Sequence, residues 1–220
     1  MAERWLLYYI TDRTAFPGDE FARRKHLLDK IAEAALAGVD YVQLREKDLS
    51  ARELESLARE AVTRLQALRT EGQPLRTKIL INSRTDAALA TGADGVHLRS
   101  DDISPRLVRD LWPKSHFGAS SPTREPLIGV SCHSAEEVTE AAENAASFAV
   151  FAPVFEKQGS APAGLDGLRQ ACRAGIPVLA LGGVTLDNAQ SCREAGAAGV
   201  AGIRLFQENT IPDVVHQLRG

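Results

Sequence analysis

Thr91-Gly92-Ala93-Asp94-Gly95-Val96 is one of three similar segments in this chain. The other two are Ala37-Gly38-Val39-Asp40 and Ala195-Gly196-Ala197-Ala198-Gly199-Val200. Each contains a glycine where a helix needs a left-handed residue to end, followed by a β-branched residue that begins a buried strand. The three segments therefore predict helices that lead directly into buried strands.

Strand-like and helix-like segments alternate on both sides of these glycines. Ser50 and Glu53 have the spacing of a capping box, which marks the beginning of a helix. The expected strands cover residues 6–11, 41–45, 78–82, 95–98, 127–131, 148–152, 177–181 and 199–203. The expected helices cover residues 21–37, 50–68, 85–90, 104–111, 134–146, 165–174, 186–195 and 212–218.

Eight strand–helix units without a change in composition predict an α/β protein, a single (β/α)8 TIM barrel formed by residues 1–220 as one domain. An open doubly wound sheet is the alternative fold. That alternative is disfavoured because the dinucleotide-binding pattern GxGxxG is missing after the first expected strand.

The composition is that of an ordinary globular protein, with 44% hydrophobic and 25% charged residues. The formal net charge of −3 and the aromatic content of 5% disfavour a protein that coats nucleic acid, which needs a basic surface and stacking platforms. We therefore expect no nucleic-acid partner, although a local phosphate site stays compatible with this charge.

The three cysteines, Cys132, Cys172 and Cys192, are far apart and lack metal-ligand spacing, so we expect neither a disulfide scaffold nor structural zinc. The apolar run in the first ten residues is too short for a signal peptide, and no stretch of about 18 apolar residues occurs. We expect a cytoplasmic protein that does not bind a membrane. A homo-oligomer is left open, because one sequence shows no interface.

Polar side chains gather where the expected strands end. In a barrel of this kind the carboxyl ends of the strands face the active site. The residues at these ends are Asp12, Gln43, Arg45, Lys47, Asn82, His97, Asp101, Asp102, Ser131, His133, Lys157, Gly182, Gly183 and Arg204.

Two of these groups have the chemistry of phosphate sites. Gln43, Arg45 and Lys47 alternate along one strand, so two cations and an amide share a face that can hold a pyrophosphate. The alternative is a structural ion pair with Glu46 or a neighbouring carboxylate. The paired glycines at 182–183 let backbone N–H groups approach an anion near the end of the barrel's last strands, with Arg204 in reach. The alternative there is a simple tight turn.

Asp101 and Asp102 follow the fourth expected strand and offer oxygen ligands to a hard cation such as Mg²⁺. Capping of the next helix is the alternative role, and without other evidence we prefer it. His133 is interpreted either as a general acid or base or, with Ser134, as part of a helix cap. His97 is expected to pack inside the barrel, and Cys132 is expected to be a buried, unreactive thiol.

Four segments in this order carry a resemblance that covers nearly the whole chain: Val42-Gln-Leu-Arg-Glu-Lys47, Ala93-Asp-Gly-Val-His-Leu98, Gly129-Val-Ser-Cys-His133 and Pro177-Val-Leu-Ala-Leu-Gly-Gly-Val184. The chain resembles the thiamine phosphate synthase family and its sister group, the thiazole tautomerases. The resemblance to the synthases implies a (β/α)8 barrel that joins hydroxymethylpyrimidine diphosphate to a thiazole phosphate. In that reaction pyrophosphate departs with the help of Mg²⁺ and cationic side chains.

The resemblance also implies roles for single residues. Catalytic roles fall to Arg45, Lys47, Ser131, His133 and Lys157, and Asp102 matches a magnesium ligand. The substrate-binding residues it implies are Gln43, Arg45, Lys47, Asn82, Gly182, Gly183 and Arg204. The implied partners are small phosphorylated pyrimidine and thiazole substrates.

Three positions depart from the synthase pattern. Ser83 stands where the family usually has the second metal-binding Asp, and the family's Thr-x-Thr-Lys segment is replaced by Phe155-Glu-Lys-Gln-Gly-Ser160. Lys157 in this segment is interpreted either as a replacement for the missing cation from a shifted position or as an exposed loop lysine. Arg204 stands where the family usually has a small Ser. These departures leave two alternatives open, a metal-independent thiazole tautomerase that uses His133, and a non-catalytic barrel that binds thiamine precursors.

Overall fold

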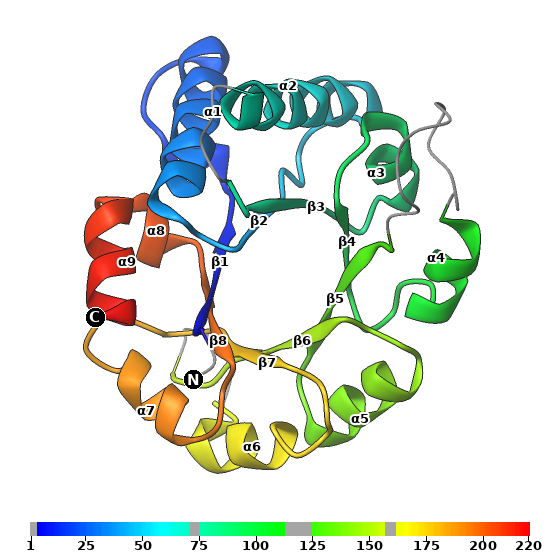
Figure 1. Cartoon of the computed structure of the whole chain (residues 1–220), viewed down its shortest axis with the longest axis vertical. Helices are drawn as coiled ribbons and strands as arrows, with labels where there is room; N and C mark the ends of the chain where they lie inside the picture. Colours follow the sequence, from blue (N-terminus) through cyan, green and yellow to red (C-terminus); the bar gives the residue numbers. More distant parts are fainter. Residues whose placement is uncertain (1–3, 71–74, 113–124, 157–161) are drawn as a thin grey trace.

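The computed structural model describes residues 4–70, 75–112, 125–156 and 162–220. Eight parallel strands form a closed barrel in sequence order, with β1 paired to β8 (Figure 1). The strands are β1 (Leu6–Ile10), β2 (Tyr41–Leu44), β3 (Lys78–Asn82), β4 (Gly95–Leu98), β5 (Leu127–Cys132), β6 (Phe148–Phe151), β7 (Val178–Ala180) and β8 (Gly199–Gly202). The closed barrel confirms the predicted fold and excludes the open doubly wound sheet.

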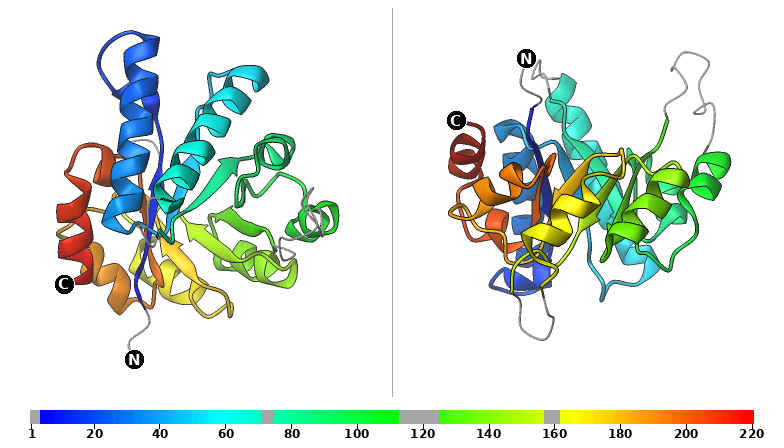
Figure 2. Two further views of the ribbon diagram at one scale, coloured as in Figure 1. Left: turned by 45° about the horizontal axis from the view of Figure 1, so that its top comes forward. Right: turned by 90° about the horizontal axis from the view of Figure 1, so that it is seen from below.

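Helices surround this barrel on the outside (Figures 1 and 2). They are α1 (Glu20–Ala37), α2 (Ala51–Thr70), α3 (Thr85–Thr91), α4 (Pro105–Leu111), α5 (Ala135–Glu143), α6 (Gly164–Ala171), α7 (Ala189–Glu194), α8 (Arg204–Gln207) and α9 (Ile211–Arg219). A short 3-10 helix, η1 (Arg13–Ala15), follows β1. Neither η1 nor α8 is among the expected helices, because a single turn of helix is too short to show a hydrophobic period.

The predicted helix ends are confirmed at two of the three repeated segments. Gly38 and Gly92 end α1 and α3 in the left-handed conformation, with φ of 86° and 68°. At the third segment α7 ends one residue earlier, at Ala195, and Gly196 follows with φ of 98°. Ser50 and Glu53 form the expected capping box, in which the Ser50 N–H donates to the Glu53 carboxylate over 2.9 Å.

Side chains alternate between two apolar cores. Those facing outward pack against the helices, as Val42 and Leu44 of β2 do, and those facing inward fill the barrel. The inner core contains Tyr8, Ile10, Leu80, Phe148, Val150, Leu179 and Ala201. Since the strand period is two residues, Gln43, Asn82, His97 and Ser131 lie on the inner face near the carboxyl ends. The barrel thus points the predicted polar residues of β2 to β5 at its mouth.

Among the described helices, none is both long and apolar enough to cross a membrane.

Candidate functional site

Hydrogen bonds to a buried carboxylate, that of Glu46, fix the segment after β2. Glu46, 5% exposed, accepts hydrogen bonds from the Thr11 hydroxyl (2.5 Å) and from the Arg13 N–H (2.9 Å). The Nη1 of Arg13 approaches the same carboxylate at 3.3 Å. Glu46 is therefore committed to Thr11 and Arg13, and the alternative that it forms the ion pair of Arg45 is wrong.

Arg13 connects this carboxylate to two others. Its guanidinium is nearly buried and binds Asp48 through two hydrogen bonds of 2.7 and 2.8 Å, and Glu20 through one of 2.7 Å. The hydrogen bonds from Arg13 lower the pKa of Asp48, and the same carboxylates raise the pKa of Arg13 far above its ordinary value. A charge-assisted network of this kind fixes the backbone that it contacts.

Arg45 is left without a carboxylate partner in the part of the chain that the structure describes. Its backbone N–H donates to Thr11 over 3.0 Å, and its side chain is half-buried. Its charge is close enough to lower the pKa of His97. Gln43 is buried and donates to the Tyr8 hydroxyl over 3.1 Å, while Lys47 is exposed. Strand β2 ends at Leu44, so Arg45 and Lys47 project from the loop that follows it rather than from the strand.

Asn82, Ser83 and Asp102 meet at the ends of β3 and β4. The Asn82 amide donates to the Ser83 hydroxyl over 3.4 Å. The pKa of Asp102 is lowered against the effect of its burial by hydrogen bonds from the Arg99 backbone and then from Ser83, together with the charge of Arg99. Asp102 also accepts from the backbone N–H of Arg99 over 2.8 Å. Ser83 has a φ of 56°, a left-handed backbone that non-glycine residues seldom adopt and that often marks a functional position.

The acidic pair does not cap the next helix. Ser104 is the N-cap of α4, and its side chain accepts from the Leu107 N–H. Asp101 instead forms an ion pair with Arg99 at 3.3 Å. Our preference for capping by Asp101 and Asp102 is therefore wrong, because the helix begins two residues further along than their position requires.

The oxygen donors around Asp102 are few, but they are of the kind that binds a hard cation. One ionised carboxylate and the Ser83 hydroxyl are oxygen ligands of the kind that Mg²⁺ prefers, and Mg²⁺ takes one or two carboxylates when substrate phosphates supply the rest. No cluster of three or more metal-binding side chains occurs within the described residues. The residues present thus fit a magnesium ion that depends on its substrate for further ligands.

Strand β5 contributes Ser131, and the loop after it contributes His133. Ser131 contacts the Nε2 of buried His97 over 2.8 Å, which confirms that His97 packs inside the barrel. Cys132 is buried, and burial raises the pKa of its thiol to about 12, as expected for an unreactive cysteine. Ser134 caps α5.

His133 is exposed, and its Nδ1 lies 2.7 Å from the carbonyl oxygen of Ala152. Because a carbonyl oxygen only accepts, Nδ1 carries the proton of the neutral ring and Nε2 keeps a free electron pair.

The segment after β7 has a backbone that only glycine suits. Gly182 and Gly183 have φ of 91° and 66°, and a Cβ on Gly182 would lie 2.7 Å from the Cα of Pro153. Within the described residues, no protein acceptor takes a hydrogen bond from the N–H of either glycine. These two N–H groups are therefore available to an anion. The segment is also a close-packed turn, as the alternative interpretation expects, and binding of an anion by the glycines stays a prediction.

The remaining predicted residues lie apart or outside the described chain. Arg204 is exposed and begins α8, directly after the end of β8. Lys157 and Ser160 lie outside the described residues.

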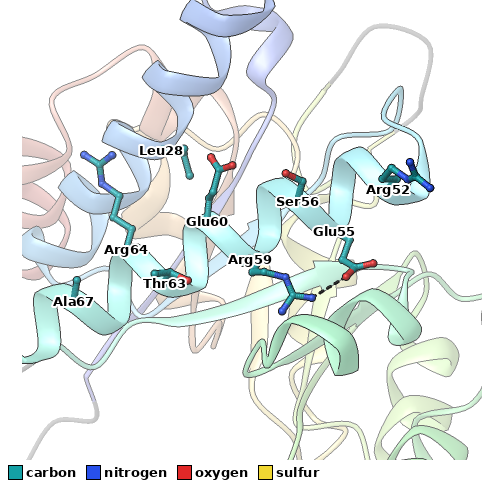
Figure 3. A pocket seen from close by; sticks show the side chains of 9 residues that line it. All are labelled: Leu28, Arg52, Glu55, Ser56, Arg59, Glu60, Thr63, Arg64 and Ala67. Atoms are coloured by element: carbon teal, nitrogen blue, oxygen red, sulfur yellow. Dashed lines mark hydrogen bonds and ion pairs between the residues drawn. The ribbon is translucent and has the colours of Figure 1, made fainter.

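A groove of about 880 Å³ on the outside of the barrel, between α1 and α2, has a different character (Figure 3). Two of its three arginines are paired with acidic side chains, Arg59 with Glu55 at 2.7 Å and Arg64 with Asp29. Most of the cationic charge there is neutralised within the groove, so the barrel mouth is the better candidate site.

Sequence reasoning missed Tyr8 and Arg13. Tyr8 stood in an apolar run, and its hydroxyl, which contacts Gln43 and His97, had no visible partner in the sequence. Arg13 follows the first strand like many surface arginines, and nothing in the sequence indicates that it is buried. Only the inward direction of Tyr8 could have been predicted from the sequence. Tyr8 and Ile10 are two residues apart on one strand and both face the barrel interior.

The comparisons with known proteins agree with this geometry. The family model described as "Thiamine monophosphate synthase" matches residues 7–206. The thiamine-phosphate synthase of Syntrophomonas wolfei is 37% identical over 202 residues, covering 89% of this chain and 85% of that protein. The corresponding protein of Roseiflexus castenholzii is 37% identical over 203 residues, covering 90% and 79%. Among solved structures, the thiamine phosphate pyrophosphorylase of Pyrococcus furiosus superposes with a TM-score of 0.76 at 26% identity, covering 99% and 95%.

Proposed function

Because the chain belongs to the thiamine monophosphate synthase family, we propose that it is a transferase that joins hydroxymethylpyrimidine diphosphate to a thiazole phosphate in thiamine biosynthesis. The observation that carries the proposal is Arg45, a half-buried guanidinium at the barrel mouth without a carboxylate partner among the described residues. A partly desolvated cation is unfavourable unless an anion accompanies it. A diphosphate is such an anion.

In the proposed reaction the bond between the pyrimidine methylene carbon and the diphosphate oxygen breaks, and both electrons leave with pyrophosphate. The thiazole nitrogen then donates its electron pair to that carbon. Arg45 and Lys47 hold the departing oxygens, since cationic donors stabilise the charge that develops on them. Gln43 and Asn82 line the pyrimidine side, and Ser131 donates a hydrogen bond at the mouth.

Mg²⁺ is part of the proposal, with Asp102 as its carboxylate ligand and Ser83 as a neutral neighbour. When bound, the ion supplies positive charge against the leaving diphosphate. Because Asp102 is the single carboxylate that we assign to the ion, we expect tight binding of Mg²⁺ only together with the diphosphate. Lys157, outside the described residues, is proposed as a further cation for the same group.

The thiazole phosphate is assigned to the opposite side of the mouth. The N–H groups of Gly182 and Gly183 are available there. Arg204 comes directly after β8, the strand that pairs with β7. Neutral main-chain donors bind phosphate without a large ionic contribution. This arrangement supports a pocket that holds the acceptor substrate through the whole reaction, while the charged side holds the group that leaves.

The test is formation of thiamine phosphate. Purified protein is mixed with hydroxymethylpyrimidine diphosphate, thiazole phosphate and Mg²⁺, and the product is followed by mass spectrometry. We expect product that disappears with a chelator and with Arg45→Ala, and that persists with Arg59→Ala, a matched arginine from the groove between α1 and α2. If no product forms while thiazole phosphate still binds, the synthase proposal is wrong.

The tautomer of His133 favours a second candidate, a metal-independent thiazole tautomerase. With Nδ1–H donating to Ala152, the free Nε2 is the form of histidine that can take a proton from a thiazole carbon. His133→Gln should abolish isomerisation of a thiazole carboxylate phosphate and leave its binding unchanged. Binding of thiazole phosphate without turnover in either assay would instead support a non-catalytic role.

A further inference from the structure

Four side chains from four strands form a continuous hydrogen-bonded relay across the barrel interior. The Gln43 amide nitrogen lies 3.1 Å from the Tyr8 hydroxyl, and that hydroxyl lies 3.2 Å from the Nδ1 of His97. The Nε2 of His97 lies 2.8 Å from the Ser131 hydroxyl. Gln43, Tyr8 and His97 are at most 3% exposed, whereas Ser131 is half-buried. The relay therefore runs from the buried interior to the site.

The amide of Gln43 sets the direction of every hydrogen in this relay. An amide nitrogen only donates, so the Tyr8 oxygen is an acceptor toward Gln43. The Nδ1 of His97 is the one other polar atom that the described hydrogen bonds place beside this oxygen, so the buried Tyr8 hydrogen needs it as acceptor, and Nδ1 carries no proton. The proton of a neutral imidazole must be on Nε2, which donates to Ser131. The hydrogen of Ser131 consequently points away from His97.

Burial favours the neutral form of His97. Desolvation and the nearby charge of Arg45 lower the pKa of His97 to about 3. A charged ring would donate from both nitrogens and leave the Tyr8 hydrogen without its acceptor.

The His97 ring is closely packed in the barrel interior. A Cβ on Gly129 would lie 2.8 Å from the Nδ1 of His97 and 2.5 Å from the ring of Phe148, so both rings occupy the space beside this glycine. Phe148 in turn meets Tyr8 edge to face, with 5.4 Å between the ring centroids. The orientation of His97 is thus set by contacts on several sides.

We propose that Tyr8 and His97 are positioning residues that orient the Ser131 hydroxyl as a hydrogen-bond donor toward an anionic oxygen of the bound substrate. The kinetic consequence rests on the proposed synthase function, whereas the tautomer of His97 does not. Neither Tyr8 nor His97 needs to touch the substrate in this role. The reverse direction, with the proton on Nδ1, would make Ser131 an acceptor at the mouth and a poor partner for a phosphate.

The first experiment reads the tautomer directly. Protein labelled with ¹⁵N in its five histidines is studied by long-range ¹H–¹⁵N correlation, and His97→Gln identifies the signal of His97. We expect a neutral ring with its proton on Nε2 and a hydrogen-bonded Nδ1. Tyr8→Phe should shift the Nδ1 signal toward that of an unbonded nitrogen. A proton on Nδ1 in the unchanged protein overturns the proposal, whatever the enzyme activity is.

The second experiment measures the consequence for turnover. Tyr8→Phe should lower kcat about 10-fold, the size of one lost hydrogen bond to the transition state, and leave KM for both substrates nearly unchanged. Tyr41→Phe is the matched control, because Tyr41 stacks on the same Phe148 with its ring 5.1 Å away and contacts no relay residue through its hydroxyl among the described hydrogen bonds. We expect wild-type kinetics for it.

A double substitution separates positioning from structural support. If Tyr8 acts through Ser131, Tyr8→Phe should cost nothing further in a Ser131→Ala background. Additive losses, or an unchanged kcat in Tyr8→Phe alone, would show that the relay only packs the barrel.

Discussion

The two sides of the barrel mouth are built by different means. On the side of β2 to β5, side chains carry the chemistry. The Asp102 carboxylate accepts from the Arg99 N–H and the Ser131 hydroxyl contacts His97, while the backbone of Arg45 is hydrogen-bonded to Thr11. On the side of β7 and β8, Gly182 and Gly183 offer only their backbone, shaped by positive φ and by close contact with the segment after β6. A group that leaves with several charges needs cations, whereas a phosphate that stays bound is held by neutral donors.

The largest effect on substrate binding is expected at Arg45, on the charged side of the mouth formed by β2 to β5. Arg45→Ala removes a guanidinium that we expect to bind the diphosphate in bidentate fashion, so the Kd of hydroxymethylpyrimidine diphosphate with Mg²⁺ should rise roughly 100-fold, the equivalent of one or two charge-assisted contacts. Calorimetry measures this, and Arg45→Lys should recover part of the affinity. An unchanged Kd in Arg45→Ala contradicts the assignment of this side.

A single added methyl group should disrupt the side of β7 and β8, where backbone N–H groups are the donors. Gly182→Ala forces a Cβ to within 2.7 Å of the Pro153 Cα at a φ of 91°, so the backbone must move and its N–H groups with it. We expect thiazole phosphate to bind about 10-fold more weakly, with diphosphate affinity unchanged.

Gly175→Ala is the matched control for this change. Gly175 also has a positive φ, of 81°, but a Cβ there would meet no atom within 4 Å. It should lower the melting temperature slightly and leave both affinities intact. Equal effects of the two variants on thiazole phosphate would show that strain, and not the position of the N–H groups, explains the loss.

Ser83→Asp sharpens the charged side by adding a second carboxylate next to Asp102. Aspartate tolerates the left-handed backbone of this position at least as well as serine does. Turnover that depends on Mg²⁺ should rise up to about 10-fold, and half-saturation should occur at a lower Mg²⁺ concentration. Activity titrations with Mg²⁺ check this, and an unchanged titration would mean that the site is not simply missing a ligand.

The smallest effect is expected at Arg204, a charge on the otherwise neutral side. Because its side chain is exposed, water screens its contribution, and Arg204→Ala should weaken thiazole phosphate binding only about 2- to 5-fold. The effect should shrink in high salt. A loss as large as that of Arg45→Ala would show that both sides of the mouth rely on cations.

The position of these residues in the barrel was predictable, and their partners were not. Gln43 and His97 are on the inner face because strands alternate, and the sequence shows that period directly. That Tyr8 contacts His97, 89 residues away, depends on how the strands close around one another. The partner of Glu46 also depends on how the strands close around one another. The sequence places Glu46 next to Arg45, but in the structure its carboxylate binds Arg13.

The sequence by itself determined the eight alternating units, the glycines that end α1 and α3, and the edge of the barrel where polar residues collect. These features follow from short-range rules, namely helix and strand periods and the backbone freedom of glycine. The tertiary structure decided which charges are neutralised and which way the hydrogen bonds of the relay run. Such pairings depend on distances across the closed barrel, and no local pattern of residues contains them.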